Sequence, residues 1–282
     1  MGLRSTGVPA DTLAALRERG TEAMAALRAA VERRGERFNL YNAGMMGDRV
    51  RFGIFPRDLL TAALMLGGDE LLREVLRFSA ATIGRRQDPC TGEEPGRVLH
   101  EFQEFRRDGL STRYNACETS HLFLLGAGQC LRQSRDEAFL REIREELRLA
   151  GEYIVRHIGD DLFWEDPRHC GAERYLLRAT YWKDSFLPGC DTSRYPVAYA
   201  LVQAQTVAAL RALAMLTTPL DLGFDRASLA AQASRMVGAL WNRLWDQEQG
   251  CPGLGDEDGA VRGVSSDGLH MLAYLCPGDV PP

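Results

Sequence analysis

One carboxylate in this chain lies inside an aromatic and cationic segment. Tyr181, Trp182 and Lys183 immediately precede Asp184. An indole can keep a neighbouring carboxyl group protonated, whereas an ammonium group favours its ionised form, so the sequence leaves the direction of its pKa shift open. Cleavage of a glycosidic bond needs such an acid, a second carboxyl group and aromatic rings that support the sugar. In the alternative interpretation, Asp184 caps a short turn and Trp182 packs in the core.

Two further pairs have the residue types of a sugar site. Arg57 and Asp58 stand side by side at the start of a predicted helix, where a forked donor and an acceptor suit adjacent hydroxyls. Asp58 is equally explained as a first-turn acid favoured by the helix dipole. His100 and Glu101 follow a Gly- and Pro-containing turn, but Glu104 occupies the position where a zinc-binding HExxH motif needs its second histidine. We therefore expect a loop hydrogen bond or a substrate contact from His100, and no metal site.

The overall composition is that of an ordinary globular protein. The chain has 282 residues, of which 45% are hydrophobic and 26% charged, and its formal charge is -5 with both signs interspersed. It can bury a sizeable core. We find no basic stripe suited to a nucleic acid and no apolar run long enough to span a membrane. Seven scattered cysteines without a CxxC pair, and no secretory signal at the N-terminus, indicate reduced thiols and a cytoplasmic protein.

Apolar residues recur with helical spacing along most of the chain, which predicts an all-α fold. The predicted helices span 11–31, 57–66, 69–83, 117–131, 136–154, 196–216, 227–244 and 267–275. No run with the two-residue period of a strand interrupts them.

Short and long connections alternate between these helices. The short links are 67–68, 132–135 and 217–225, and the long ones are 34–56, 84–115, 159–195 and 246–266. Antiparallel helix pairs standing side by side would carry every short turn at one end and every long loop at the other. Long loops in compact domains are usually functional. This pattern favours an α/α toroid over an irregular bundle, and over a solenoid, whose helix pairs would recur at a constant spacing.

Six segments between residues 50 and 276 resemble, in order, those of a known enzyme family. They are FPRDLLTAALML, TGEEPGRVLHE, STRYNACETSHLFLL, YWKDSF, PVAYALVQAQTVAAL and VSSDGLHML. The family is the amylo-α-1,6-glucosidase (glycogen debranching) group, together with related six-hairpin α/α-barrel glucosidases. The resemblance implies a catalytic mouth on the long-loop face and inverting hydrolysis of an α-glucosidic bond in carbohydrate metabolism. It implies no metal or organic cofactor.

The same resemblance assigns roles to individual residues. It makes Asp184 the general acid and places Arg57 and Asp58 on the terminal sugar. The remaining substrate-binding residues that it implies are His100, Glu101, Tyr114, Trp182 and Lys183. The expected partner is an α-glucoside or oligosaccharide, with no nucleic acid and no membrane.

Some positions depart from the family pattern. Glu118 stands where Asp is frequent, and Asp267 stands where Asn is common. Leu201 and Ala204 replace a Glu and a Gly. Polar residues at helix starts, namely Glu118, His121 and His270, can point into the same mouth or serve as caps and packed polar groups.

The number of predicted helices is smaller than a closed ring requires. We expect about eight of twelve helices, so residues 1–282 would form one partial toroid domain. A leading helix would occupy 1–35 and the hairpins 36–282. The catalytic base of the family, a Glu in its C-terminal hairpins, has no counterpart here, which suggests a truncated chain and a possible complementing C-terminal segment.

Two other functions stay open. A surviving Arg57–Asp58 subsite without a base would make the chain a non-catalytic glucoside-binding protein. Another α/α-toroid enzyme, such as a glucosylglycerate-type hydrolase or a sugar epimerase, would share the fold. An epimerase would use histidines for proton transfer, whereas the segment around Asp184 favours a hydrolase.

Overall fold

The chain divides into two compact units, Met1–Ile54 and Phe55–Pro282. The computed structural model describes residues 9–43, 45–46, 50–51, 53–67, 69–183 and 194–281. The first unit contains helix α1 (Ala10–Leu27) and two antiparallel pairs of strands. These are β1 (Arg28–Arg33) with β2 (Glu36–Tyr41), and β3 (Met45–Met46) with β4 (Val50–Arg51).

The predicted leading helix is shorter than expected. It ends at Leu27, and Val31 lies on strand β1. The helix predicted over 11–31 and the leading helix expected up to residue 35 therefore both extend too far. Arg34 and Gly35 both have positive φ, at 52° and 82°, and this conformation suits the two-residue turn of a β-hairpin. That turn reverses the chain, and the strands then satisfy each other's backbone groups. Asp11 lies in the first turn of α1 rather than at its cap.

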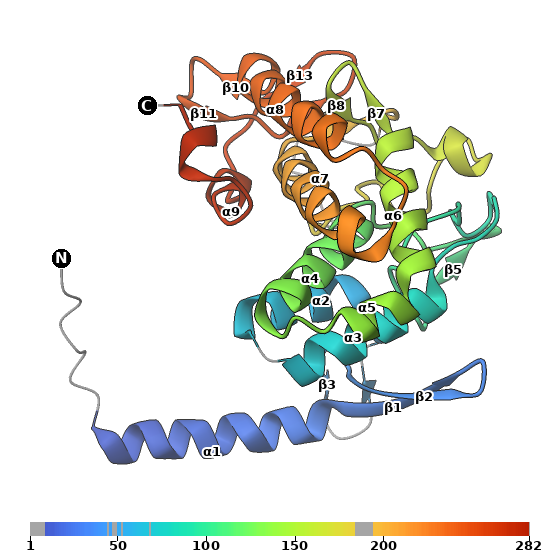
Figure 1. The fold of residues 1–282 in the computed structure, drawn as a ribbon, viewed down its shortest axis with the longest axis vertical. Helices are drawn as coiled ribbons and strands as arrows, with labels where there is room; N and C mark the ends of the chain where they lie inside the picture. Colours follow the sequence, from blue (N-terminus) through green and yellow to red (C-terminus); the bar gives the residue numbers. More distant parts are fainter. Residues whose placement is uncertain are drawn as a thin grey trace. The chain divides into compact units, whose positions relative to one another are not determined.

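Helical pairs build the second unit, which confirms the all-α class. The first pair is α2 (Pro56–Leu66) with α3 (Asp69–Thr82). The second is α4 (Thr119–Gln133) with α5 (Glu137–Glu142) and α6 (Arg144–Arg156), and the third is α7 (Ala200–Leu220) with α8 (Arg226–Arg243). A short helix, α9 (Asp267–Met271), packs on α7. The helices α2, α4 and α7 pack in succession (Figure 1).

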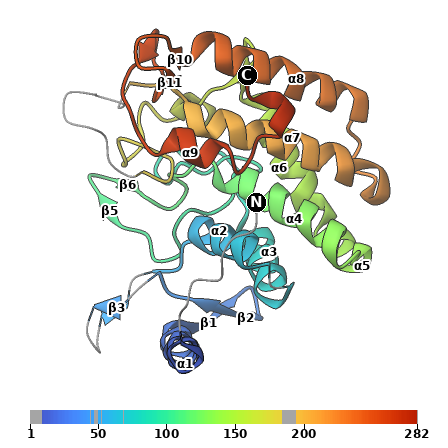
Figure 2. The same ribbon diagram turned by 90° about the vertical axis from the view of Figure 1, so that its left-hand side faces the viewer.

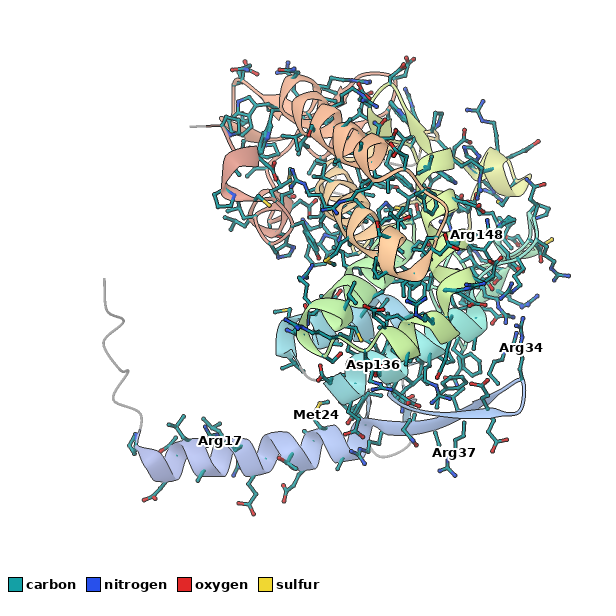
Figure 3. All side chains as sticks on the ribbon, in the orientation of Figure 1. Arg17, Met24, Arg34, Arg37, Asp136 and Arg148 are labelled. Carbon is teal, nitrogen blue, oxygen red and sulfur yellow. The ribbon has the colours of Figure 1, made fainter. Side chains whose placement is uncertain are left out.

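Local signals explain where several of these helices begin and end. Pro56 lies in the first turn of α2, and Gly67 ends that helix with a φ of 68°, a left-handed conformation that glycine adopts without strain. Asp136 caps α5 by accepting a hydrogen bond from the Phe139 backbone N–H at 3.0 Å (Figure 3). The helix predicted over 136–154 is two helices, because the backbone leaves helical geometry at Ile143.

The long connections contain short strands, so the prediction of no strands is wrong. Paired strands are β5 (Arg106–Arg107) with β6 (Leu110–Ser111), β7 (Ile158–Gly159) with β8 (Leu162–Phe163), and β10 (Trp245–Asp246) with β11 (Cys251–Pro252). A small sheet has the order β13 (Ala260–Val261), β12 (Gly255–Asp256), β9 (Ala198–Tyr199). Pairing of β9 with β12 delays the helix predicted from Pro196 until Ala200. Single 3₁₀ turns are η1 (Pro167–Cys170) and η2 (Pro277–Asp279).

The alternation of short and long links places them at different ends of the helices. Figure 2 shows β5, β6, β10 and β11 on one side of the second unit. The α4–α5 and α7–α8 turns lie on the other side. The loops 84–115 and 246–266 therefore lie on one face of this unit. Several predicted site residues belong to loop 84–115 or to the start of a helix.

Helix α7 forms the centre of the second unit. Among the described residues it is the one helix long and apolar enough to span a membrane, and 83% of its apolar window is buried in this fold. Close packing requires small residues where helices meet. A Cβ added at Gly128 of α4 would lie 3.1 Å from the Cβ of Ala212 on α7. The apolar composition of α7 is thus explained by packing against its neighbours.

Candidate functional site

Arg57 joins two segments that the sequence predicts to form a site. Its side chain is buried, and Nη1 donates a hydrogen bond to the backbone carbonyl of Tyr181 at 3.3 Å, 124 positions along the chain. Its Nε donates to Oδ1 of Asp58 at 3.1 Å. The start of α2 and the segment that leads to Asp184 therefore lie against each other.

Two carboxylates flank the Arg57 guanidinium. Oε1 of Glu118 lies 3.8 Å from Nη1, and the Glu118 side chain is 1% exposed, whereas the Asp58 side chain is 51% exposed. Glu118 directly precedes α4 at the end of a long loop. The positive charge of Arg57 is thus balanced within the protein, and Asp58 is the member of the group that offers oxygen atoms to solvent or a ligand.

Asp267 gathers the side chains of three consecutive residues. Tyr181 Oη donates to Oδ2 of Asp267 at 3.1 Å, and Trp182 Nε1 donates to Oδ1 at 2.9 Å. Nζ of Lys183 lies 3.4 Å from Oδ1. Burial raises the pKa of Tyr181 far above its ordinary value, and the Asp267 carboxylate adds to this effect. The sequence marked Asp267 as a departure from the family pattern but gave no sign of these contacts.

Aromatic rings line the same segment. Tyr181 stacks on Tyr199, with ring centroids 4.3 Å apart. The Trp182 ring lies 4.6 Å from that of His270 on α9, and Nζ of Lys183 lies 5.3 Å from the centroid of the Trp182 ring. An indole fixed at its N–H and flanked by a cation is a suitable platform for a sugar ring.

His100 is a neutral acceptor on the Arg57 side of the site. Its Nδ1 lies 2.9 Å from the carbonyl oxygen of Thr112, which only accepts, so Nδ1 carries the proton. Burial, together with the charge of Arg57, lowers the pKa of His100 to about 3. Its Nε2 is buried and has no hydrogen-bond partner among the residues that the structure describes. Within its own loop, Glu101 Oε2 accepts a hydrogen bond from Thr112 Oγ1 at 2.5 Å.

Tyr114 and His121 lie in the interior. The Tyr114 hydroxyl donates to the carbonyl of Thr82 at 2.9 Å. His121 contacts the Cys117 carbonyl through Nδ1 and the Thr206 hydroxyl through Nε2. Both side chains are buried, and their polar atoms form hydrogen bonds within the protein. In this placement they stabilise the fold.

The predicted general acid, Asp184, lies outside the described residues, as does Cys190. The structure describes this stretch of the chain up to Lys183, so the described site ends one residue before the acid. The other six cysteines are free thiols, as their scattered spacing predicts.

A separate buried cluster surrounds Glu94. Ligand atoms of Glu94, His157 and His169 lie within 4.8 Å of one another, an arrangement that can hold a metal ion. His157, however, has an acceptor at each ring nitrogen: the Trp164 carbonyl oxygen lies 2.8 Å from Nδ1 and Glu94 Oε2 lies 2.9 Å from Nε2. Each ring nitrogen of His157 therefore already has an oxygen atom of the protein within hydrogen-bond distance.

Guanidinium groups complete the neutralisation of this cluster. Arg97 and Arg156 contact the Glu94 carboxylate at 3.2 and 3.4 Å. Burial opposes ionisation, but the His157 hydrogen bond and the charges of His157 and both arginines lower the pKa of Glu94 to about 2. A divalent ion would have to displace these hydrogen bonds beside two guanidinium groups, so the charges favour an ion-pair network over a metal site.

A hollow of about 270 Å³ lies among the last short strands. It is lined by residues of the 244–262 segment, including Trp245, Asp246, Glu248 and Arg262. None of the predicted site residues that the structure describes lines it, so it is separate from the group around Arg57 and Asp267.

Comparison with known proteins gives similarity at the level of structure. No family model matches the sequence, and no curated protein matches it. The structure is similar to a rhamnosidase from Klebsiella oxytoca with rhamnose bound (TM-score 0.52, 18% identity, covering 82% of this chain and 40% of that chain). It is also similar to a GH78 family rhamnosidase of Bacillus sp. GL1 (TM-score 0.51, 16% identity, covering 75% of this chain and 20% of that chain). A third similar structure is an uncharacterized conserved protein from Thermus thermophilus (TM-score 0.57, 15% identity, covering 94% and 73%).

These similarities identify the architecture. The fold is the α/α toroid type found in glycoside hydrolases, as the alternation of links predicted. The chain spans less than half the length of both rhamnosidases. The glycogen debranching group remains a prediction from the sequence.

Proposed function

We propose that this protein is a glycoside hydrolase that cleaves an α-linked sugar with inversion, and that Asp184 is its general acid. The observation that carries the proposal is the hydrogen bond from Arg57 to the Tyr181 carbonyl. Within a glycoside hydrolase-type fold, it joins the proposed sugar-binding pair to the segment that bears the proposed acid.

The charges of the site favour a neutral sugar over a sugar phosphate or a uronic acid. Arg57 lies between Asp58 and Glu118, and Lys183 lies beside Asp267, so each cation has a carboxylate next to it. Such a site has no surplus positive charge for an anionic substrate. Half-exposed Asp58 would accept hydrogen bonds from sugar hydroxyls, and the Trp182 ring would support the sugar.

The proposed reaction follows the requirements of inverting hydrolysis. Asp184 gives its proton to the glycosidic oxygen as the bond to the anomeric carbon breaks, and a water molecule attacks that carbon from the opposite face. A second carboxylate, roughly 6.5–9.5 Å from the first in such enzymes, takes the proton of the water. We assign that base to no residue of the chain, and a complementing segment that carries it forms part of the proposal.

The substrate follows from two sources that disagree in detail. The sequence segments favour an α-glucoside of the debranching type, whereas two of the similar structures are rhamnosidases. We propose the α-glucoside, because the order of all six segments supports it. Aryl α-glucoside and aryl rhamnoside, assayed side by side, distinguish the two.

The test compares Asp184→Asn with wild type. We expect the variant to reduce turnover of maltose, assayed with azide as the nucleophile, about 10²- to 10⁴-fold, while calorimetry shows unchanged maltose binding. The matched control is Asp108→Asn, because the Asp108 side chain is 73% exposed and belongs to a different loop. A measurable wild-type turnover of maltose with azide that Asp184→Asn leaves unchanged would refute the role of Asp184.

Adding azide to the assay distinguishes a chain that lacks only the catalytic base from a chain that has no glycosidase activity. Azide attacks the anomeric carbon without a general base, so a chain that lacks the base should form the inverted glycosyl azide while water hydrolysis stays slow. Sugar binding with neither hydrolysis nor azide product would favour the non-catalytic glucoside-binding protein.

A further inference from the structure

The segment before Asp184 is held from two sides. Arg57 binds its backbone at the Tyr181 carbonyl, and Asp267 binds its side chains. The two contacts come from helix starts far apart in the chain, since Arg57 belongs to α2 and Asp267 opens α9. Residues 181–183 are therefore fixed immediately before the proposed acid.

The chemistry at Asp267 requires a carboxylate. Its two oxygens face three donors, which are the Tyr181 hydroxyl, the Trp182 indole N–H and the Lys183 ammonium. An ionised carboxylate only accepts, and it has room for all three. An asparagine in the same place has one accepting oxygen, and its amide N–H₂ would meet a donor. The Asp that distinguishes this chain from the family pattern thus matches the donors around it.

Asp267 itself is firmly placed. Its side chain is 1% exposed, and its backbone N–H donates to Ser265 Oγ at 3.1 Å. Helix α9 packs on the central helix α7 and also brings His270 against the Trp182 ring. A buried, anchored acceptor can transmit its position to the groups bound to it.

We propose that Asp267 is a positioning residue, which fixes Tyr181, Trp182 and Lys183 and through them supports the catalytic role proposed for the next residue, Asp184. This inference rests on the proposed function of Asp184. Asp267 acts through the 181–183 segment and does not contact the reacting atoms. Its loss therefore lowers the rate of the chemical step more than the affinity for sugar.

The first readout needs no activity. The indole N–H signal of Trp182, assigned in a ¹⁵N spectrum by its loss in Trp182→Phe, should move in Asp267→Asn, and the amides of 181–183 should exchange faster. The control Asp256→Asn alters another buried carboxylate, one that binds Arg243 and the Gly259 N–H, and should leave that signal unchanged. An unchanged Trp182 signal and unchanged exchange in Asp267→Asn would overturn the inference.

The second readout separates positioning from binding. We expect kcat of Asp267→Asn to fall roughly 10²-fold, as misplacement of a catalytic group by about 1 Å can cause, while KM changes less than about threefold. Asp267→Glu, which keeps the carboxylate, should recover part of kcat. A wild-type kcat in Asp267→Asn would overturn the positioning role, even where the Trp182 signal moves. If wild type turns over no sugar, with or without azide, the proposed function is refuted instead. The Trp182 indole signal and the amide exchange of residues 181–183 in Asp267→Asn then decide whether Asp267 fixes this segment.

Discussion

Replacing Arg97 with methionine removes a fully buried cation from the Glu94 cluster. The guanidinium donates to both oxygens of Glu165, at 2.6 and 3.4 Å, and to Glu94 Oε1 at 3.2 Å. It also donates to the Tyr175 hydroxyl at 2.8 Å and to the Tyr114 carbonyl at 2.5 Å. Methionine fills similar space but leaves these acceptors without their donor.

The expected loss is large because the partners stay buried and charged. The side chains of Arg97, Glu94 and Glu165 are all 0% exposed. Breaking a buried ion pair by removing one partner costs about 3–5 kcal/mol, whereas a small protein has a free energy of unfolding of about 5–15 kcal/mol. We therefore expect Arg97→Met to lose between about a fifth of the free energy of unfolding and all of it. The double variant Arg97→Met/Glu165→Gln should recover about 1–3 kcal/mol, because it also removes the stranded charge.

Urea denaturation followed by far-ultraviolet circular dichroism measures these differences at pH 7. The matched control is Arg148→Met, since Arg148 pairs with Glu145 and Glu152 on the surface of α6 (Figure 3), and such pairs contribute less than about 1 kcal/mol. Arg97→Lys retains a charge and should fall between wild type and Arg97→Met. Equal denaturation midpoints for Arg97→Met and Arg148→Met would refute the reasoning.

Three further predictions concern stability. The pKa of Glu94 in the folded protein is about 2 against an ordinary 4.5. Its ionisation therefore contributes about 3 kcal/mol to the free energy of unfolding above pH 4.5, and this contribution is lost as the pH falls toward 2. In melting curves, Glu94→Gln should therefore lose less stability than wild type between pH 4.5 and pH 2. Gly96→Ala would place a Cβ 2.0 Å from the Leu149 carbonyl oxygen at a φ of +87°, and should lower the free energy of unfolding, measured in urea, by about 2–4 kcal/mol. In the control Gly238→Ala the new Cβ meets open space, and the free energy of unfolding should rise by up to about 1 kcal/mol. Asp136→Ala removes the cap of α5 and should cost about 1 kcal/mol by the same assay; an unchanged midpoint would contradict it.

Helical periodicity predicts most of the second unit because its helices have one buried face. The ranges predicted from 57, 69 and 227 lie within a few residues of α2, α3 and α8. The same periodicity failed over 28–33, where a two-residue turn and cross-strand pairing decide the structure. It also failed to detect β9, because two residues become a strand only when β12 lies beside them.

The candidate site could be predicted only in part. The order of helices and loops predicts that Arg57 lies near the segment that contains Tyr181, since both belong to the face formed by the long loops. The roles of Asp267 and Glu118 could not be read from the sequence, because nothing local distinguishes an acid that caps a helix from one that meets donors 85 residues away. The predicted geometry of Asp184 lies outside the described residues and stays a prediction.

The sequence by itself determined the helical class, the alternation of short and long links, and the residue types available to a sugar site. These properties are written in local spacing and in turn residues such as Gly67. Only the tertiary structure decided which acids face which donors, because a hydrogen bond depends on positions set by packing of remote helices. The Arg57–Tyr181 hydrogen bond and the three donors around Asp267 are contacts of this kind.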